Sequence, residues 1–358
     1  MKITDVRAII PRGTNEPRDW RTAMAQIAVV VETDEGVSGL GVGGGGQAGI
    51  HIIASVLRQV LVDSDPADIE GLWQRMYRAT LPFGRKGVAV MALSGVDLAL
   101  WDLAGKRVGK PVYELLGGLK NPVMPAYASI GHTITDQANA GFKHVKLHMP
   151  RPSAGIEDDV VIVRTARERL GPEIELYTDA FLAWDVEGTL ARAARFAEYG
   201  VRWIEESISP DDISGYAEMC RRSPIPIAGG EHEYCEHGFR ELLDRKALQV
   251  LQPDACWVGG MTQLAKVFKL GAERGVWVVP HRGAEVWGLH AIAALSDRPL
   301  AESGRPWITW LAGEPGIQNG SISPGSAPGF GVAIRPESIL HLDADVQNQM
   351  VNARVVQL

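Results

Sequence analysis

The sequence has 358 residues, of which 46% are hydrophobic and 22% are charged. A chain of this length and composition can bury about three quarters of the surface that it exposes when unfolded, which excludes a disordered or fibrous protein. The 36 Lys and Arg residues against 43 Asp and Glu residues give a formal charge of −7 without a long basic run, so no nucleic-acid partner is expected.

Cysteine usage and hydropathy restrict where the protein works. The three cysteines, Cys220, Cys235 and Cys256, lack paired C-x-x-C spacing. This pattern indicates neither a disulfide framework nor a zinc–thiolate site, and it is typical of a reducing compartment. The first residues lack a signal-peptide pattern, and no window of about 18 residues is continuously apolar, so we predict a cytoplasmic protein without a membrane partner.

The first part of the chain is predicted to form a small α+β unit, residues 1–120. Residues 3–10, 25–32 and 37–42 are apolar and β-branched, and Thr33-Asp34-Glu35-Gly36 is turn chemistry that makes the last two strands an antiparallel hairpin. After the glycines at 43–46, apolar residues recur at helical spacing over 50–62, 66–78 and 88–106.

From residue 123 onward, strand-length apolar runs alternate with amphipathic helical windows. The expected strands are residues 124–130, 144–148, 174–178, 203–204, 225–228, 249–251 and 276–279, with a weaker eighth near Leu300. The expected helices are residues 156–169, 186–199, 213–222, 238–244 and 261–274. This alternation predicts a closed parallel α/β barrel over residues 121–312. Residues 313–358 are expected to pack back on the first unit.

Polar residues stand directly after successive predicted strands. They are Asp179, Glu205, Glu231, Asp254 and His281. The intervals between them are 26, 26, 23 and 27 residues, each the length of one strand with its helix. Because the carboxyl ends of barrel strands share one mouth, we expect these side chains to converge on one site.

The carboxylates of this set predict a divalent cation. Held together in a low-dielectric mouth, Asp179, Glu205 and Glu231 would repel one another by on the order of several kcal/mol unless a cation lies among them. Mg²⁺ prefers hard oxygen ligands and is the simplest choice. The alternative is that each acid only caps the helix after its strand, although caps need no regular spacing.

Basic side chains on two faces of the mouth are candidates for proton transfer. His281 lies one strand from Asp254, which suits a general base held in one tautomer by a carboxylate. Lys146 and His148 share the inward face of an earlier strand, and a lysine partly buried beside a cation is expected to titrate below its ordinary pKa. The alternatives are histidines hydrogen-bonded within the core and a lysine at the rim.

Several motifs together point to one family. They are Trp203-Ile204-Glu205-Glu206, Gly230-Glu231-His232, Gln252-Pro253-Asp254 with Gly259-Gly260, Pro280-His281, the helix at 94–103 with Leu115-Leu116-Gly117-Gly118, and Pro328-Gly329-Phe330-Gly331-Val332. In this combination the chain resembles the mandelate racemase group of the enolase superfamily over nearly its whole length. Within that group, residues 228–233 and 251–254 are most similar to the L-rhamnonate dehydratases and related acid-sugar dehydratases.

This resemblance implies an α+β capping domain over a modified (β/α)8, TIM-like barrel. It implies Mg²⁺ bound by Asp179, Glu205 and Glu231, and abstraction of the proton α to a substrate carboxylate to give a metal-stabilised enediolate. By the same resemblance, Glu302 falls on the glutamate that hydrogen-bonds the substrate carboxylate, with Glu314 as the second choice of register.

The resemblance also assigns the two faces of the site, with some departures. Lys146 and His148 fall on the family's K-x-K pair, with His148 in place of the second lysine. His281 and Asp254 fall on the opposing dyad. Phe181 stands where the family has an amide, and Ser207 where it has a proline. The 31-residue interval from His148 to Asp179 predicts an added loop at 151–155 beside the site.

Loops of the first unit are predicted to bind the substrate. The candidate substrate-binding residues are Arg12, Arg18, Trp20 and Arg21 of the loop at 11–21, and His51 beside the glycines at 43–46. Arginines suit a polyhydroxy acid, although a merely solvated loop is the alternative. Residues 41–46 formally match G-x-G-x-x-G, but we reject a dinucleotide site because their strand belongs to a hairpin.

These inferences predict a Mg²⁺-dependent dehydratase of a sugar acid. His281, oriented by Asp254, is expected to take the α-proton and then protonate the departing β-hydroxyl, while Lys146 or His148 assists. The partner is a small-molecule carboxylate, and a homo-oligomer is expected by analogy with the family. The alternatives are a racemase, epimerase or cycloisomerase with the same metal and bases, and a non-catalytic carrier.

Overall fold

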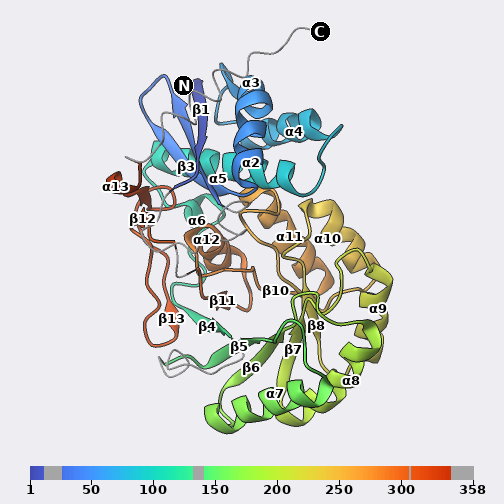
Figure 1. Cartoon of the computed structure of the whole chain (residues 1–358). Helices are drawn as coiled ribbons and strands as arrows, with labels where there is room; N and C mark the ends of the chain where they lie inside the picture. The colour runs from blue at the N-terminus through green and yellow to red at the C-terminus, as the bar shows by residue number, and fades with distance from the viewer. Residues whose placement is uncertain (12–25, 132–140, 306–307, 340–358) are drawn as a thin grey trace.

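The computed structural model describes residues 1–11, 26–131, 141–305 and 308–339. An antiparallel sheet with helices forms the amino-terminal part, and a curled sheet of parallel strands carries most of the remaining chain (Figure 1). This is the predicted barrel with an amino-terminal α+β cap, so the expected fold class is confirmed.

The amino-terminal sheet has three antiparallel strands in the order β1-β2-β3. They are β1 (Ile3–Ile9), β2 (Ile27–Thr33) and β3 (Ser38–Gly43). The helical elements that follow are α2 (Gly46–Ile52), a π-helical segment (Ile53–Leu57), α3 (Arg58–Leu61), α4 (Ile69–Thr80), α5 (Val88–Val108) and α6 (Val112–Leu115). The predicted hairpin is present, and the antiparallel β3 cannot open the parallel unit that a dinucleotide site needs.

Helix α5 packs directly on β3 because glycines line the face of the strand that it covers. Gly39, Gly41 and Gly43 alternate along β3, so they share one face. A Cβ atom at Gly41 would overlap the carbonyl oxygen of Gly95, and one at Gly39 would overlap that of Ala99. Gly41 and Gly43, two of the glycines that match a phosphate-binding pattern in the sequence, therefore belong to a packing surface for α5.

Replacing Gly41 with Ala should destabilise the protein by about 1–3 kcal/mol, the usual cost of overpacking a core. The helix would have to move, since backbone and not a flexible side chain occupies the space. Urea unfolding measures the effect. Gly316→Ala is the matched control because nothing lies within 4 Å of a Cβ atom there. Equal stability of the two variants would contradict this packing.

Helix α5 is long and apolar enough to cross a membrane by length and composition, yet 78% of its most apolar window is buried inside the protein. Two buried acids tie it to its surroundings. Asp97 accepts the backbone N–H and the hydroxyl of Thr262 at 2.9 and 2.6 Å. Asp102 accepts the backbone N–H groups of Leu40 and Phe330 at 2.7 and 2.8 Å. These bonds make α5 a core helix that joins the cap to the barrel.

Parallel strands form the barrel, and each neighbouring pair in the ladder is parallel. In spatial order they are β10 (Trp277–Val278), β9 (Val250–Leu251), β8 (Ile227–Gly229), β7 (Val201–Glu205), β6 (Glu175–Asp179), β5 (His144–His148), β4 (Met124–Ile130) and β11 (Ala301–Glu302). Strand β11 is the eighth strand expected near Leu300. The two ends of this strand order, β10 and β11, meet through a backbone hydrogen bond. The N–H of Ala284, after β10, donates to the carbonyl of Glu302 in β11 at 2.8 Å.

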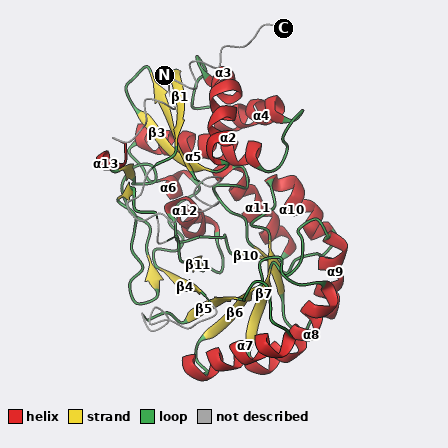
Figure 2. Ribbon diagram, in the orientation of Figure 1, coloured by secondary structure: helices red, strands yellow, loops and turns green. Residues whose placement is uncertain are grey.

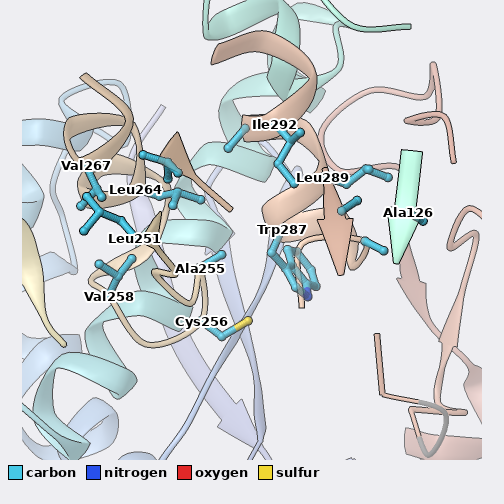
Figure 3. Packing of buried hydrophobic residues seen from close by; sticks show 14 of the residues in the cluster. Ala126, Leu251, Ala255, Cys256, Val258, Leu264, Val267, Trp287, Leu289 and Ile292 are labelled. Atoms are coloured by element: carbon cyan, nitrogen blue, oxygen red, sulfur yellow. The ribbon is translucent and has the colours of Figure 1, made fainter. Parts of the chain in front are cut away.

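Helices cover the outside of these strands (Figure 2). They are α7 (Ile156–Leu170), α8 (Val186–Phe196) with a 3₁₀ turn (Ala197–Tyr199), α9 (Ile213–Arg222), α10 (Cys235–Asp244), α11 (Gly260–Arg274) and α12 (Val286–Leu295). The sequence did not predict α12, because it is apolar on all sides and lacks an amphipathic period. Figure 3 shows Trp287, Leu289 and Ile292 of α12 in the same buried cluster as Leu264 and Val267 of α11.

The described end of the chain contacts both parts. β12 (Leu311–Ala312) pairs with β14 (Ala333–Ile334), and β13 (Ser321–Ile322) joins β4 in antiparallel fashion. Gly329 forms a bridge with Pro111, next to α6, and a short helix α13 (Pro336–Ile339) follows β14. This segment therefore lies against α5 and α6 as well as against the barrel.

Candidate active site

The side chains predicted from the strand ends come together at the carboxyl end of the barrel. They are Lys146 and His148 of β5, Asp179 of β6, Glu205 of β7, Glu231 after β8, Asp254 after β9, His281 after β10, and Glu302 of β11. Strand register places His148 beside Asp179 and Asp179 beside Glu205. Asp254 and His281 form a parallel bridge beyond their strands.

Lys146 is a buried cation in this group. Its Nζ lies 2.5 Å from Glu205 Oε1, 2.7 Å from Glu302 Oε1 and 3.4 Å from Asp179 Oδ2. Burial alone would lower the pKa of Lys146, but Glu205 and Glu302 outweigh it and raise this pKa well above its ordinary value. Between these carboxylates Lys146 is an ammonium, with a pKa raised and not lowered as was expected beside a cation. Its predicted part in proton transfer stays a prediction.

His281 and Asp254 form a hydrogen-bonded pair. His281 Nδ1 lies 2.8 Å from Asp254 Oδ2, and Nε2 lies 3.0 Å from Glu231 Oε2. Asp254 Oδ1 accepts the backbone N–H of Cys256 at 2.7 Å. Burial alone would raise the pKa of Asp254, but Arg282 and His281 outweigh it and hold this pKa at about 2. An ionised Asp254 keeps a proton on Nδ1, which leaves Nε2 to exchange protons in the mouth.

His148 lies on the opposite face of the mouth. Its Nδ1 is 3.1 Å from Asp179 Oδ2, and its Nε2 is 2.9 Å from Ser129 Oγ. Burial lowers the pKa of His148, an effect that the charge of Asp179 only partly offsets. The imidazole is therefore neutral near pH 7, with Nε2 in a hydrogen bond to Ser129 and Nδ1 close to Asp179.

Counting one residue per strand end missed two members of the site, Glu206 and His232. Glu206 is buried, and its Oε2 lies 2.7 Å from His232 Nδ1. Burial alone would lower the pKa of His232, but Glu206 outweighs it and raises this pKa. Both residues lie in the quoted motifs beside Glu205 and Glu231, which was the signal available in the sequence. In the described ranges, the ligand atoms of Glu206, Glu231 and His232 lie within 4.8 Å of one another.

The donor chemistry of the mouth fits a divalent cation. His232 compensates Glu206, and Lys146 is shared by three carboxylates, so Asp179, Glu205 and Glu231 together carry more negative charge than these cations balance. Burial, and then neighbouring carboxylates, raise the pKa of Glu205 and of Glu231 well above their ordinary values. Excess carboxylate oxygen in a buried mouth is the ligand set that Mg²⁺ prefers.

Glu302, and not Glu314, reaches the mouth. Besides the Lys146 contact, Glu302 Oε2 accepts the backbone N–H of Arg282 at 2.7 Å. Burial alone would raise the pKa of Glu302, but Lys146 and His281 hold this pKa at about 2. The hydrogen bond from Glu302 to the substrate carboxylate that the resemblance implies stays a prediction, and it requires a protonated Glu302. Glu314 lies after β12, where Arg335 is its charged neighbour.

Aromatic rings line the rim of the mouth. The Phe181 ring packs edge-on to His232 with the centroids 5.8 Å apart. The guanidinium of Arg151, in the predicted added loop, lies 3.8 Å from the Phe181 centroid. Trp257 lies on the other side of His232, with the ring centroids 5.8 Å apart. Phe181, which stands where the family has an amide, thus places an aromatic ring at the rim, and the Arg151 guanidinium covers this ring.

The predicted substrate-binding loop lies outside the described residues, and with it Arg12, Arg18, Trp20 and Arg21. His51 is described and is exposed on α2. Close to α2, a Cβ atom on Gly44 would lie 3.2 Å from Trp257 Nε1, so the glycine loop reaches the rim. Ser207 is buried with its Oγ 3.5 Å from Met219 Sδ, and this departure faces the core.

Comparison with known proteins finds two family matches that together cover most of the chain. Residues 17–117 match the mandelate racemase / muconate lactonizing enzyme N-terminal domain, and residues 131–338 match the enolase C-terminal domain-like family. An L-rhamnonate dehydratase from Saccharopolyspora erythraea is 36% identical over 330 residues, which is 88% of this chain and 84% of the relative.

Two solved structures are similar along nearly the whole chain. The 3,6-anhydro-D-galactonate cycloisomerase from Zobellia galactanivorans has a TM-score of 0.86 at 30% identity, covering 95% of this chain and 99% of that one. A rhamnonate dehydratase from Gibberella zeae, complexed with Mg, has a TM-score of 0.86 at 27% identity, covering 95% of each chain.

Proposed function

The chain belongs to the mandelate racemase and muconate lactonizing enzyme group of the enolase superfamily, and from this premise we propose that it is a Mg²⁺-dependent dehydratase of a sugar acid, an aldonate or aldarate. It is an enzyme, a carbon–oxygen lyase, which removes the non-catalytic carrier from consideration. The observation that supports the proposal best is the His281–Asp254 pair facing a carboxylate-lined mouth.

We assign the cation to Asp179, Glu205 and Glu231. When bound, it supplies positive charge to the oxygens of the substrate carboxylate as the adjacent C–H bond breaks. Lys146, buried between Asp179 and Glu205, holds these two carboxylates at the strand ends. The same ammonium keeps Glu302 ionised at the edge of the mouth.

His281 carries the proton in both steps of the proposed reaction. Its Nε2 takes the proton from C2 of the sugar acid, and the ionised Asp254 stabilises the imidazolium that forms. The same Nε2–H then protonates the C3 hydroxyl, whose C–O bond breaks to release water. This proton transfer returns the imidazole of His281 to its starting state. The enol that remains then rearranges to a 2-keto-3-deoxy acid.

A substrate screen tests this function. The protein is incubated with MgCl₂ and a panel of aldonic and aldaric acids that includes L-rhamnonate, and keto-acid product is trapped with semicarbazide and read by its absorbance. We expect Mg²⁺-dependent keto acid from at least one acid. Absence of keto acid from the entire panel would contradict the proposal.

A racemase, epimerase or cycloisomerase is the second candidate, because His148 lies opposite His281 and the similar cycloisomerase shows that this fold serves such reactions. In D₂O, an epimerase would incorporate deuterium at C2 without releasing a keto acid. A dehydratase gives net loss of water, so NMR of the products separates the two.

Replacing His148 with Asn should lower turnover only modestly, by about tenfold or less, because both of its nitrogens are engaged by Asp179 and Ser129. An essential acid or base normally contributes about 10²–10⁴-fold. Steady-state kinetics on the best substrate measures the effect. A loss as large as that of a His281 variant would show that both faces are needed, as in a two-base reaction.

A further inference from the structure

Asp254 has a second cationic partner besides His281. Arg282 binds the same oxygen, Oδ2, through Nη2 and also through Nε, which lies 3.0 Å away. Its guanidinium lies over the ring of Trp257, 5.3 Å from the centroid, and the residue is only 6% exposed. Arg282 is therefore a buried cation that contacts both members of the pair, since its Nε also lies 3.4 Å from His281 Nδ1.

Arg282 is itself held from its far side. Its Nη1 lies 3.3 Å from Glu285 Oε2, and Arg305 binds both oxygens of Glu285, at 2.8 and 2.6 Å. With its amide oxygen turned toward Arg305, Gln26 accepts from Arg305 Nη1 at 2.6 Å. Two buried carboxylates thus alternate with two arginines in a chain of contacts that runs from the pair to the start of β2.

The backbone of Arg282 is also unusual. Its φ of 53° lies in the left-handed region, which a residue other than glycine adopts only where the surroundings fix it. The backbone N–H donates to Glu302, and the side chain turns back to Asp254. One strained residue therefore contacts two acids of the mouth.

We propose that Arg282 is a positioning residue for the acid/base pair, which fixes Asp254 Oδ2 at the place where His281 Nδ1 meets it. The proposal rests on the proposed function, because it takes His281 as the group that moves the proton. Asp254 Oδ1 is already bound by the N–H of Cys256, so Arg282 removes the remaining freedom of the carboxylate to turn. A fixed carboxylate fixes the plane and the tautomer of the imidazole.

The test compares Arg282→Met and Arg282→Lys with a matched control, Arg192→Met. Arg192 is also buried, binds Asp159 at 2.7 Å and lies 4.5 Å from the centroid of Trp184, but it belongs to α8, away from the pair. We expect Arg282→Met to lower kcat by about 10–100-fold, as loss of a partner that orients a functional group does, with KM within about threefold. Arg282→Lys, which keeps the charge, should recover part of kcat.

Thermal unfolding separates misfolding from mispositioning, since both Met variants lose a buried ion pair. A kcat of Arg282→Met no lower than that of Arg192→Met would overturn the proposal, as would a change confined to KM. If Arg282→Met does not fold, Arg282→Lys tests the proposal instead. A wild-type kcat of Arg282→Lys would then overturn the proposal.

A second measurement needs no turnover, so it can distinguish failure of the Arg282 proposal from failure of the proposed function. ¹⁵N NMR of the histidine rings in protein with MgCl₂ reports the tautomer of His281, and His281→Asn identifies its signals. We expect a Nδ1–H form in the wild type that Arg282→Met, but not Arg192→Met, shifts or broadens. An unchanged His281 signal in Arg282→Met would overturn the proposal even if the screen finds no substrate.

Discussion

His281→Asn should reduce keto-acid formation by about 10³-fold or more, because the side chain that moves the proton in both steps is lost. Asn keeps a polar group of similar size beside Asp254, so the mouth is not opened to water. Steady-state and single-turnover kinetics with the best substrate measure the loss. Calorimetric titration with MgCl₂ should give an affinity close to that of the wild type.

His290→Asn is the matched control for this prediction. His290 is a buried histidine of α12 whose Nδ1 accepts the backbone N–H of Tyr113 at 3.2 Å. Replacing His290 with Asn should lower the unfolding temperature and leave kcat within a few-fold of the wild type. Turnover of His281→Asn within about tenfold of the wild type would remove His281 from the mechanism.

Removing the cation should abolish turnover, and loss of Glu205 should weaken its binding far more than loss of Glu206. Treatment with EDTA and back-titration with MgCl₂ test the first point. For the second point, we expect Glu205→Gln to lower Mg²⁺ affinity by more than about 100-fold, because a metal ligand is lost. We expect Glu206→Gln to lower Mg²⁺ affinity by about tenfold, the effect of losing a residue that only orients a ligand. The reason is that Glu206 has His232 as its own partner, whereas Glu205 shares the single charge of Lys146 with Asp179 and Glu302.

The two variants are matched in size and charge and differ by one position in the chain. If Glu206→Gln had the larger effect, the cation would belong to Glu206, Glu231 and His232, the group whose ligand atoms lie close together. Asp179 and Glu205 would then serve only as partners of Lys146.

The strand ends were the part of this site that the sequence could predict. Strands with crossover helices repeat at a nearly constant interval, and the carboxyl ends of parallel strands must meet at one edge. The spacing of the sequence therefore predicts one set of side chains, Asp179, Glu205, Glu231, Asp254 and His281. The bounds of β4 and β5 were also predictable, because each is a short apolar run between clear turn signals.

What depends on side-chain packing could not be predicted. The high pKa of Lys146 arises from three carboxylates that come from different strands, so no local pattern reports it. Glu206 lies in the mouth because its φ of 40° turns the chain just after β7. Arg282 follows His281 directly in the sequence, yet only the fold shows that it returns to Asp254. Helix α12 has no polar face, so its sequence lacks the helical spacing of polar and apolar residues by which a helix is predicted.

A crystal structure of the protein grown with MgCl₂ tests the central claim most directly. We predict one octahedral ion with oxygen ligands from Asp179, Glu205 and Glu231 at about 2.0–2.1 Å, and His281 Nε2 facing the open side of the mouth. An ion held instead by Glu206, Glu231 and His232, or a mouth in which Asp179 and Glu205 bind no ion at saturating Mg²⁺, would contradict it.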